Sequence, residues 1–81
     1  MKENTLNLQA LMRAQVPITS VLMEMTRLGS SVLLNWGEDD NLWECSWITG
    51  GKRYTAFDLI LDSAVRQCAM KALSAADAVR M

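Results

Sequence analysis

The spacing of apolar residues changes twice along this chain, and these changes restrict the folds open to it. Over residues 17–28 the apolar residues recur every three or four positions, as on one face of an amphipathic helix. Over residues 32–48 they alternate with polar residues, as in strands that have one covered face. Over residues 57–73 the helical spacing returns. The pattern therefore predicts a sheet that follows one helix and precedes another.

Two turn segments divide the strand region. The segment 37–41, with the sequence GEDDN, has the composition of a loop. Gly50-Gly51 suits a two-residue hairpin, because both turn positions need the positive φ that glycine readily adopts. A third strand is expected over residues 52–55. Thr55 and Asp58 then resemble a capping box at the start of the last helix.

The chain before the sheet is expected to form two helices. Val16-Pro17 separates a short N-terminal helix over residues 5–16 from the helix over 17–28, which Gly29 is placed to end. The prediction is an α+β fold of order α-α-β-β-β-α, in which a three-stranded antiparallel sheet packs on helices. All 81 residues are expected to form a single domain, 1–81, with its core in 17–73.

The expected core combines one face of the sheet with the last helix. Trp43, Cys45 and Trp47 share a strand face, and Cys45 and Cys68 are expected to be reduced core residues. The last helix carries a continuous apolar stripe: Leu61, Ala64, Val65, Cys68, Ala69, Ala72 and Leu73. The six methionines have two interpretations, gap-filling in a small core or an adaptable exposed binding surface.

Composition excludes several classes of function. The formal net charge of −1 gives little electrostatic drive for non-specific binding to phosphate backbones. The absence of histidine removes the usual general base and the commonest metal ligand. We expect a non-enzymatic protein with no cofactor, metal or small-molecule substrate. No segment approaches the ~18 apolar residues of a membrane helix, so a cytoplasmic location is expected.

The candidate partner-binding residues are acids and aromatics. Glu38, Asp39, Asp40 and Glu44 lie within seven positions, and they form either an ordinary solvated loop or an acidic patch for a basic partner. All five aromatic residues lie between Trp36 and Phe57. Two or three of them are expected in the core, and Trp36 or Tyr54 is expected to be exposed and to anchor a partner. The predicted contact set is Trp36, Glu38, Asp39, Asp40, Glu44 and Tyr54.

The segment 17–73 resembles a double-stranded-RNA-binding domain. The resemblance lies in three stretches: Pro17-Ile18 with Leu22, Glu24 and Gly29; Gly50-Gly51-Lys52; and Ala64, Cys68-Ala69 and Ala72-Leu73. It implies the same helix, three-strand, helix topology. In that family the last helix begins with a basic cluster. Here residues 59–65 hold one acid and no base, and the loop 37–41 holds three acids, so direct nucleic-acid binding is not expected.

The chain also resembles the small acidic or near-neutral α/β proteins of phages and mobile elements, anti-CRISPR proteins among them, in size, composition, layout and lack of catalytic motifs. This resemblance implies a cytoplasmic inhibitor, monomeric or homodimeric, that binds a host defence complex by occluding a surface or by mimicking nucleic acid. The first alternative is a divergent double-stranded-RNA-binding module, used for dimerisation or for RNA binding through Lys52, Arg53, Arg66 and Lys71. The second is a regulatory subunit that pairs through its methionine-rich first helices.

Overall fold

The computed structural model describes residues 10–11 and 16–80, with side chains as far as residue 75. Its elements follow the order α2 (Ile18–Leu28), β1 (Val32–Gly37), β2 (Leu42–Thr49), β3 (Lys52–Asp58) and α3 (Leu61–Arg80). This order confirms the predicted α+β fold with one antiparallel sheet. The N-terminal helix predicted over residues 5–16 lies largely outside the described residues.

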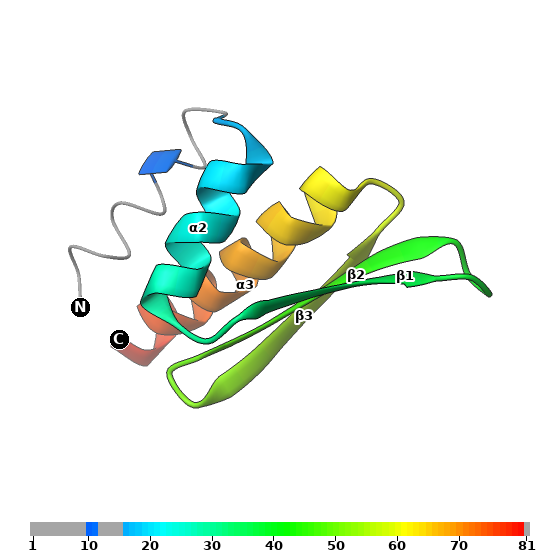
Figure 1. Cartoon of the computed structure of the whole chain (residues 1–81). Coiled ribbons are helices and arrows are strands. Elements are labelled where there is room, and N and C mark those ends of the chain that lie inside the picture. The colour runs from blue at the N-terminus through cyan, green and yellow to red at the C-terminus, as the bar shows by residue number, and fades with distance from the viewer. Residues whose placement is uncertain (1–9, 12–15, 81) are drawn as a thin grey trace.

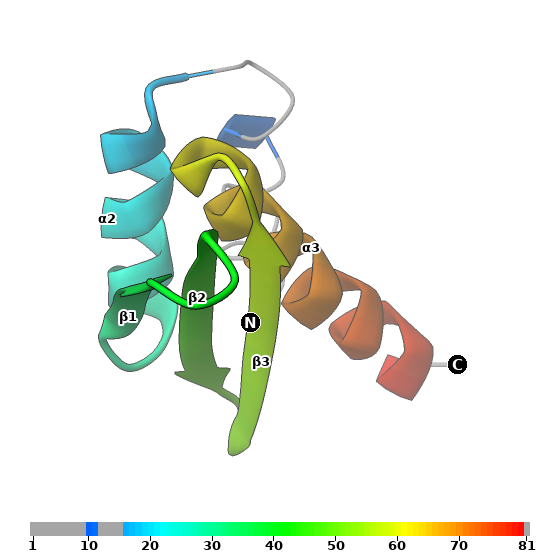
Figure 2. The ribbon, with the colours of Figure 1, turned by 90° about the vertical axis from the view of Figure 1, so that its right-hand side faces the viewer.

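The sheet is a meander in which β2 is the central strand. Both pairings are antiparallel, and the register aligns Leu34 with Cys45 and Cys45 with Ala56. Gly50 and Gly51 have φ values of 59° and 79°, which confirms the two-residue hairpin. Both helices lie on the same side of the sheet (Figure 1), with α2 toward β1 and α3 along β2 and β3 (Figure 2). No helix of the described residues lies on the other face of the sheet.

The hydrophobic core lies between the sheet and the two helices. Its buried apolar side chains are Val21, Met25, Cys45, Trp47, Ala56, Ala64, Val65, Cys68, Ala69, Ala72 and Leu73. The predicted stripe of the last helix is therefore confirmed, although Leu61 at its start is only partly buried. The small residues of this stripe let α3 pack close to the sheet.

The two cysteines are free and buried, and the Cys68 thiol donates a hydrogen bond to the Tyr54 carbonyl oxygen at 3.2 Å. Among the three tryptophans only Trp47 is in the core. Met25 is fully buried, as gap-filling in the core predicts, whereas Met23 and Met70 are exposed. A binding role for the exposed methionines stays a prediction.

The boundary between β3 and α3 differs from the prediction. The third strand continues to Asp58, since Phe57 pairs with Glu44 and Asp58 with Trp43, and the helix begins only at Leu61. The predicted capping box of Thr55 and Asp58 is wrong. Asp58 instead ends the strand, and its Oδ1 accepts a hydrogen bond from the Ile60 backbone N–H two residues later.

Gly29 ends α2 as expected, but it is not in a left-handed conformation. Its N–H donates to the Met25 carbonyl oxygen at 3.0 Å, and its φ of −148° is accessible to any residue. Glycine is needed here for space, because a Cβ at this position would lie 2.7 Å from the Ile48 carbonyl oxygen. The end of α2 therefore rests directly on the backbone of β2.

Candidate protein-binding surface at the hairpin end

Two tryptophans pack against each other where the sheet extends past the helices (Figure 1). Trp36 and Trp43 are directly opposite in the register of β1 and β2, and their ring centroids are 5.2 Å apart at an interplanar angle of 56°. This separation is within the range of favourable aromatic pairs. The side chain of Trp36 is 42% exposed, as expected from the sequence, and Trp43 is half-buried. The pair therefore forms an aromatic surface that is partly open to solvent.

The loop that joins these two strands is held by local hydrogen bonds. The Asn41 N–H donates to the Gly37 carbonyl oxygen at 2.9 Å, and Asp40 Oδ1 accepts from the Leu42 N–H at 3.3 Å. Asn41 adopts a φ of 55°, which asparagine tolerates better than most residues. Glu38 and Asp39 are exposed beside them. The three acids thus project from an ordered turn.

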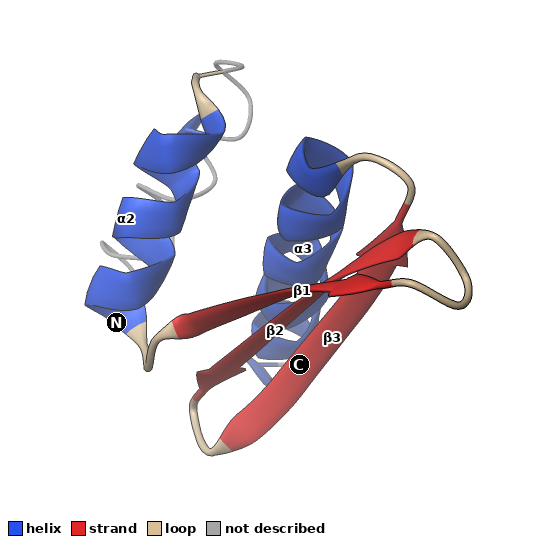
Figure 3. Cartoon of the chain, turned by 45° about the vertical axis from the view of Figure 1, so that its right-hand side comes forward, coloured by secondary structure: helices blue, strands red, loops and turns tan. Residues whose placement is uncertain are grey.

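The corner between β3 and α3 lies at the same end of the sheet (Figure 3). The Asp58 carboxylate accepts hydrogen bonds from the Ile60 N–H at 3.0 Å, the Ser63 hydroxyl at 3.1 Å and the Gln67 amide at 2.6 Å. These hydrogen bonds hold the pKa of Asp58 below its usual value, and the bond from the Ile60 N–H has the largest effect. The corner they fix leaves Leu59 and Ile60 with exposed fractions of 69% and 64%.

We use the term hairpin end for the surface made of Trp36, Trp43, the loop 38–41, Leu59 and Ile60. Its acids Glu38, Asp39 and Asp40 form no ion pair with any described residue. The cations Lys52 and Arg53 begin β3, next to the turn at Gly50-Gly51 and at the opposite end of the sheet. The sheet therefore carries negative charge at one end and positive charge at the other.

The structure brings together four of the six predicted contact residues. Trp36, Glu38, Asp39 and Asp40 lie at the hairpin end. Glu44 does not join them, because strand alternation places it on the opposite face of β2 from Trp43, where it is half-buried. Tyr54 is also separate: it is half-buried and pairs with Trp47, about 13 Å along the sheet from Trp43.

The sequence interpretation missed Leu59 and Ile60, because it placed them in the first turn of a helix. The signal that could have found them is Asp58, since an aspartate side chain often binds the backbone N–H two residues later in a turn. Such a turn makes the next two residues a connection rather than a helix. Phe57, which the sequence interpretation placed at the start of the last helix, instead lies in β3 and is 52% exposed on the uncovered face of the sheet.

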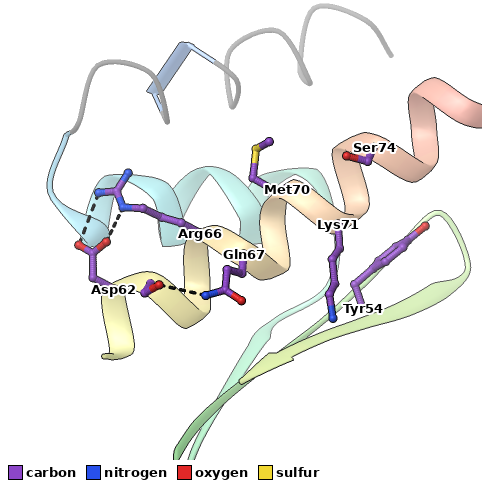
Figure 4. A pocket seen from close by; sticks show the side chains of 8 residues that line it. Tyr54, Asp62, Arg66, Gln67, Met70, Lys71 and Ser74 are labelled. Carbon is purple, nitrogen blue, oxygen red and sulfur yellow. Dashed lines mark hydrogen bonds and ion pairs between the residues drawn. The ribbon is translucent and has the colours of Figure 1, made fainter. Parts of the chain in front are cut away.

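An open groove of about 820 Å³ lies between β3 and α3, away from the hairpin end. Its cations already have hydrogen-bond partners. Lys71 Nζ donates to the Thr55 carbonyl oxygen at 2.6 Å, and Arg66 donates to the Val16 carbonyl oxygen. Arg66 also donates to Asp62 (Figure 4). These bonds tie α3 to β3 and to the segment before α2. The groove is explained by structural contacts, and we assign it no ligand.

Within residues 10–11 and 16–80, no cluster of three or more potential ligands could hold a metal ion, and no helix is long and apolar enough to cross a membrane. Comparison of the chain with known protein families, with characterised proteins and with solved structures finds no match. The functional argument therefore rests on the physical properties of the hairpin end.

Proposed function

We propose that this chain is a non-enzymatic inhibitor that binds a nucleic-acid-binding protein complex and blocks its basic surface. The observation that carries this proposal is the presence of three acids, without ion pairs to described residues, beside exposed apolar side chains at one end of the sheet. Carboxylates in this position would occupy the place of phosphates on the partner. Trp36, Leu59 and Ile60 would supply the apolar contact that gives an interface most of its affinity.

The order of the hairpin end supports this proposal. Loop 38–41 and the Asp58 corner are held by short-range hydrogen bonds, so that little conformational entropy is lost when a partner binds. An acidic loop that served only to keep the sheet soluble would not need exposed apolar residues around it. We assign the partner, by resemblance to phage and mobile-element inhibitors, to a host defence complex in the bacterial cytoplasm.

The alternative of a double-stranded-RNA-binding module shares the order of elements but has weak electrostatic support. The first turns of α3, where that family places its basic cluster, follow exposed Leu59 and Ile60 and contain Asp62. Arg66 is paired with Asp62 and Lys71 with a backbone carbonyl. Only Lys52 and Arg53 offer cations without such contacts to described residues.

The proposal is tested with the triple variant Glu38→Gln, Asp39→Asn, Asp40→Asn. These amides remove the charge but keep the side-chain size, and the amide oxygen at position 40 still accepts the hydrogen bond from Leu42. A tagged protein is used to capture complexes from a nuclease-treated bacterial lysate, and the nucleic-acid affinity of the captured complex is measured with and without the chain. The wild type is expected to capture a stoichiometric complex and to reduce its nucleic-acid binding, and the triple variant to lose at least tenfold in affinity.

A matched control raises the net charge by the same amount elsewhere. Thr19→Lys, Thr26→Lys and Ser31→Lys change exposed residues outside the hairpin end and should leave capture intact. Equal capture by the triple variant would contradict the role of the loop. Loss of all captured material on nuclease treatment would favour nucleic-acid binding and contradict the inhibitor proposal.

A further inference from the structure

The uncovered face of the sheet carries apolar side chains from all three strands. Leu33 on β1, Ile48 on β2 and Phe57 on β3 have exposed fractions between 43% and 58%. The register places Leu33 beside Ser46, two positions from Ile48 on the central strand. Both helices lie on the other side of the sheet (Figure 1). Among the described residues, nothing covers this face.

The polar side chains between these apolar residues are already hydrogen-bonded to one another. The Ser46 hydroxyl lies 3.1 Å from the Thr55 hydroxyl and 3.3 Å from the Glu44 carboxylate. Ser46 is buried even though its face of the sheet is uncovered. Burying a polar group in an interface costs the most free energy when the group loses its hydrogen-bond partner. The centre of this face can therefore be buried at low cost.

The face has one charge of each sign, at opposite ends. Glu44 lies two positions before Ser46 on β2, and Arg53 pairs with Ile48, two positions after it. Neither charge has an ion pair with a described residue. A surface with this distribution is complementary to a copy of itself that is turned end for end.

We propose that this face binds a second copy of the chain, in a two-fold dimer with the two sheets packed face to face. A two-fold axis that passes over Ser46, across the strands, places Glu44 of one copy over Ile48 of the other. Arg53, the neighbour of Ile48 on β3, then reaches the carboxylate of Glu44. The same operation places Arg53 over Phe57, a favourable arrangement for a guanidinium and an aromatic ring.

The charges select this arrangement over the other two-fold packing. An axis parallel to the strands would place Glu44 over Glu44 of the second copy, and like charges in contact cost several kcal/mol. The turned arrangement also sets the basic end of each sheet beside the acidic end of its partner. Strand alternation places Trp36 on the covered side with Trp43, and Leu59 and Ile60 follow the end of β3, so this packing does not use them.

The size of the face sets the expected affinity. Three strands of about seven residues present a face of roughly 14 Å by 23 Å. This area is below the ~800 Å² per partner that stable complexes commonly bury. The dimer is therefore expected to be weak, with a Kd of roughly 10–100 µM.

The test is sedimentation equilibrium of the purified chain from 1 to 500 µM, which needs no other protein. The wild type should dimerise over this range, whereas Glu44→Arg and Arg53→Glu should each raise the Kd at least tenfold by placing like charges together. An equimolar mixture of the two single variants should dimerise again, because the new arginine of one meets the new glutamate of the other. The loss in the Glu44→Arg homodimer separates the two packings, because an axis parallel to the strands would only exchange one pair of like charges at position 44 for another and would leave the Kd little changed.

The control is Met23→Arg, which adds a charge to an exposed apolar residue of α2 and should leave the Kd unchanged. A wild type that stays monomeric at 500 µM would overturn the proposal. So would single variants that dimerise like the wild type, or a mixture that stays monomeric. The inference is independent of the proposed function, since loss of partner capture would leave these masses unchanged.

Discussion

Replacing Gly29 by alanine tests the close approach of α2 to the sheet. A Cβ at position 29 would lie 2.7 Å from the Ile48 carbonyl oxygen, 2.9 Å from Thr49 Cβ and 3.0 Å from Trp47 Nε1. The φ of −148° causes no strain for alanine. The effect of the substitution is therefore steric, and the end of α2 must move away from β2 to relieve it.

Two opposing effects decide the magnitude. An added methyl group in a tightly packed place costs about 1–3 kcal/mol. A change from glycine to alanine also reduces the entropy of the unfolded chain, which stabilises the fold by about 0.4–1 kcal/mol. The steric effect is larger, because the nearest atom belongs to the backbone and cannot rotate aside. The net result is a destabilisation of about 1–2 kcal/mol, or a Tm lower by roughly 4–16 °C for a domain of this size.

Urea unfolding and thermal melting monitored by circular dichroism measure this change. Asparagine substitutions at two glycines provide the matched comparison. Gly50→Asn should be nearly neutral, because asparagine tolerates the positive φ of 59° and a Cβ there meets nothing within 4 Å. Gly29→Asn should destabilise more than Gly29→Ala. If Gly29→Ala is as stable as the wild type or more so, α2 does not rest on β2 in this way.

Three further substitutions test the core and the corner of the sheet by the same unfolding measurement. Met25→Ala should destabilise the fold by about 2–5 kcal/mol, because Met25 is fully buried. Met23→Ala should change the stability by less than about 0.5 kcal/mol, because Met23 is exposed. Equal effects would contradict the orientation of α2. Asp58→Asn should lower the stability at pH 7, because the ionised carboxylate, whose pKa is lowered in the fold, stabilises the folded state. The difference in stability from the wild type should shrink as the pH falls below about 4. A difference that persists at pH 3 would point to another cause. Contact with the Cys68 thiol and burial raise the pKa of Cys45 in the folded protein. The stability should therefore fall as the pH rises above about 8.5, the pKa of a cysteine in the unfolded chain. Cys45→Ala should lose less stability than the wild type between pH 8 and 10, and an identical loss would refute this assignment.

The alternation of apolar residues predicted the strands and their covered face, because side chains of a strand point to the two faces in turn. It placed Cys45 and Trp47 in the core correctly. Helical periodicity likewise identified the buried stripe of α3. The dipeptide Gly50-Gly51 predicted the turn between β2 and β3, because few other dipeptides allow positive φ angles at two consecutive residues.

The end of β3 could not be predicted in this way. An apolar residue such as Phe57 fits both a strand and the first turn of a helix, and pairing with Glu44 decides between them. The candidate site was predicted only in part for a similar reason. Alternation put Trp43 and Trp47 on one face but did not show where the helices stop covering it, so the half-burial of Tyr54 and of Trp43 follows from tertiary packing.

The three tryptophans provide separate optical probes of the core and of the hairpin end. Trp47 lies in the core, and no described residue accepts a hydrogen bond from its indole nitrogen, so its emission should be blue-shifted and should report unfolding. Trp36 is open to solvent and packs against Trp43 at 5.2 Å, a tilted pair that should give an exciton signal in circular dichroism. A ligand at the hairpin end should change the exciton signal and leave the core emission constant. Spectra of the unlabelled protein can therefore distinguish binding at the hairpin end from a loss of the fold.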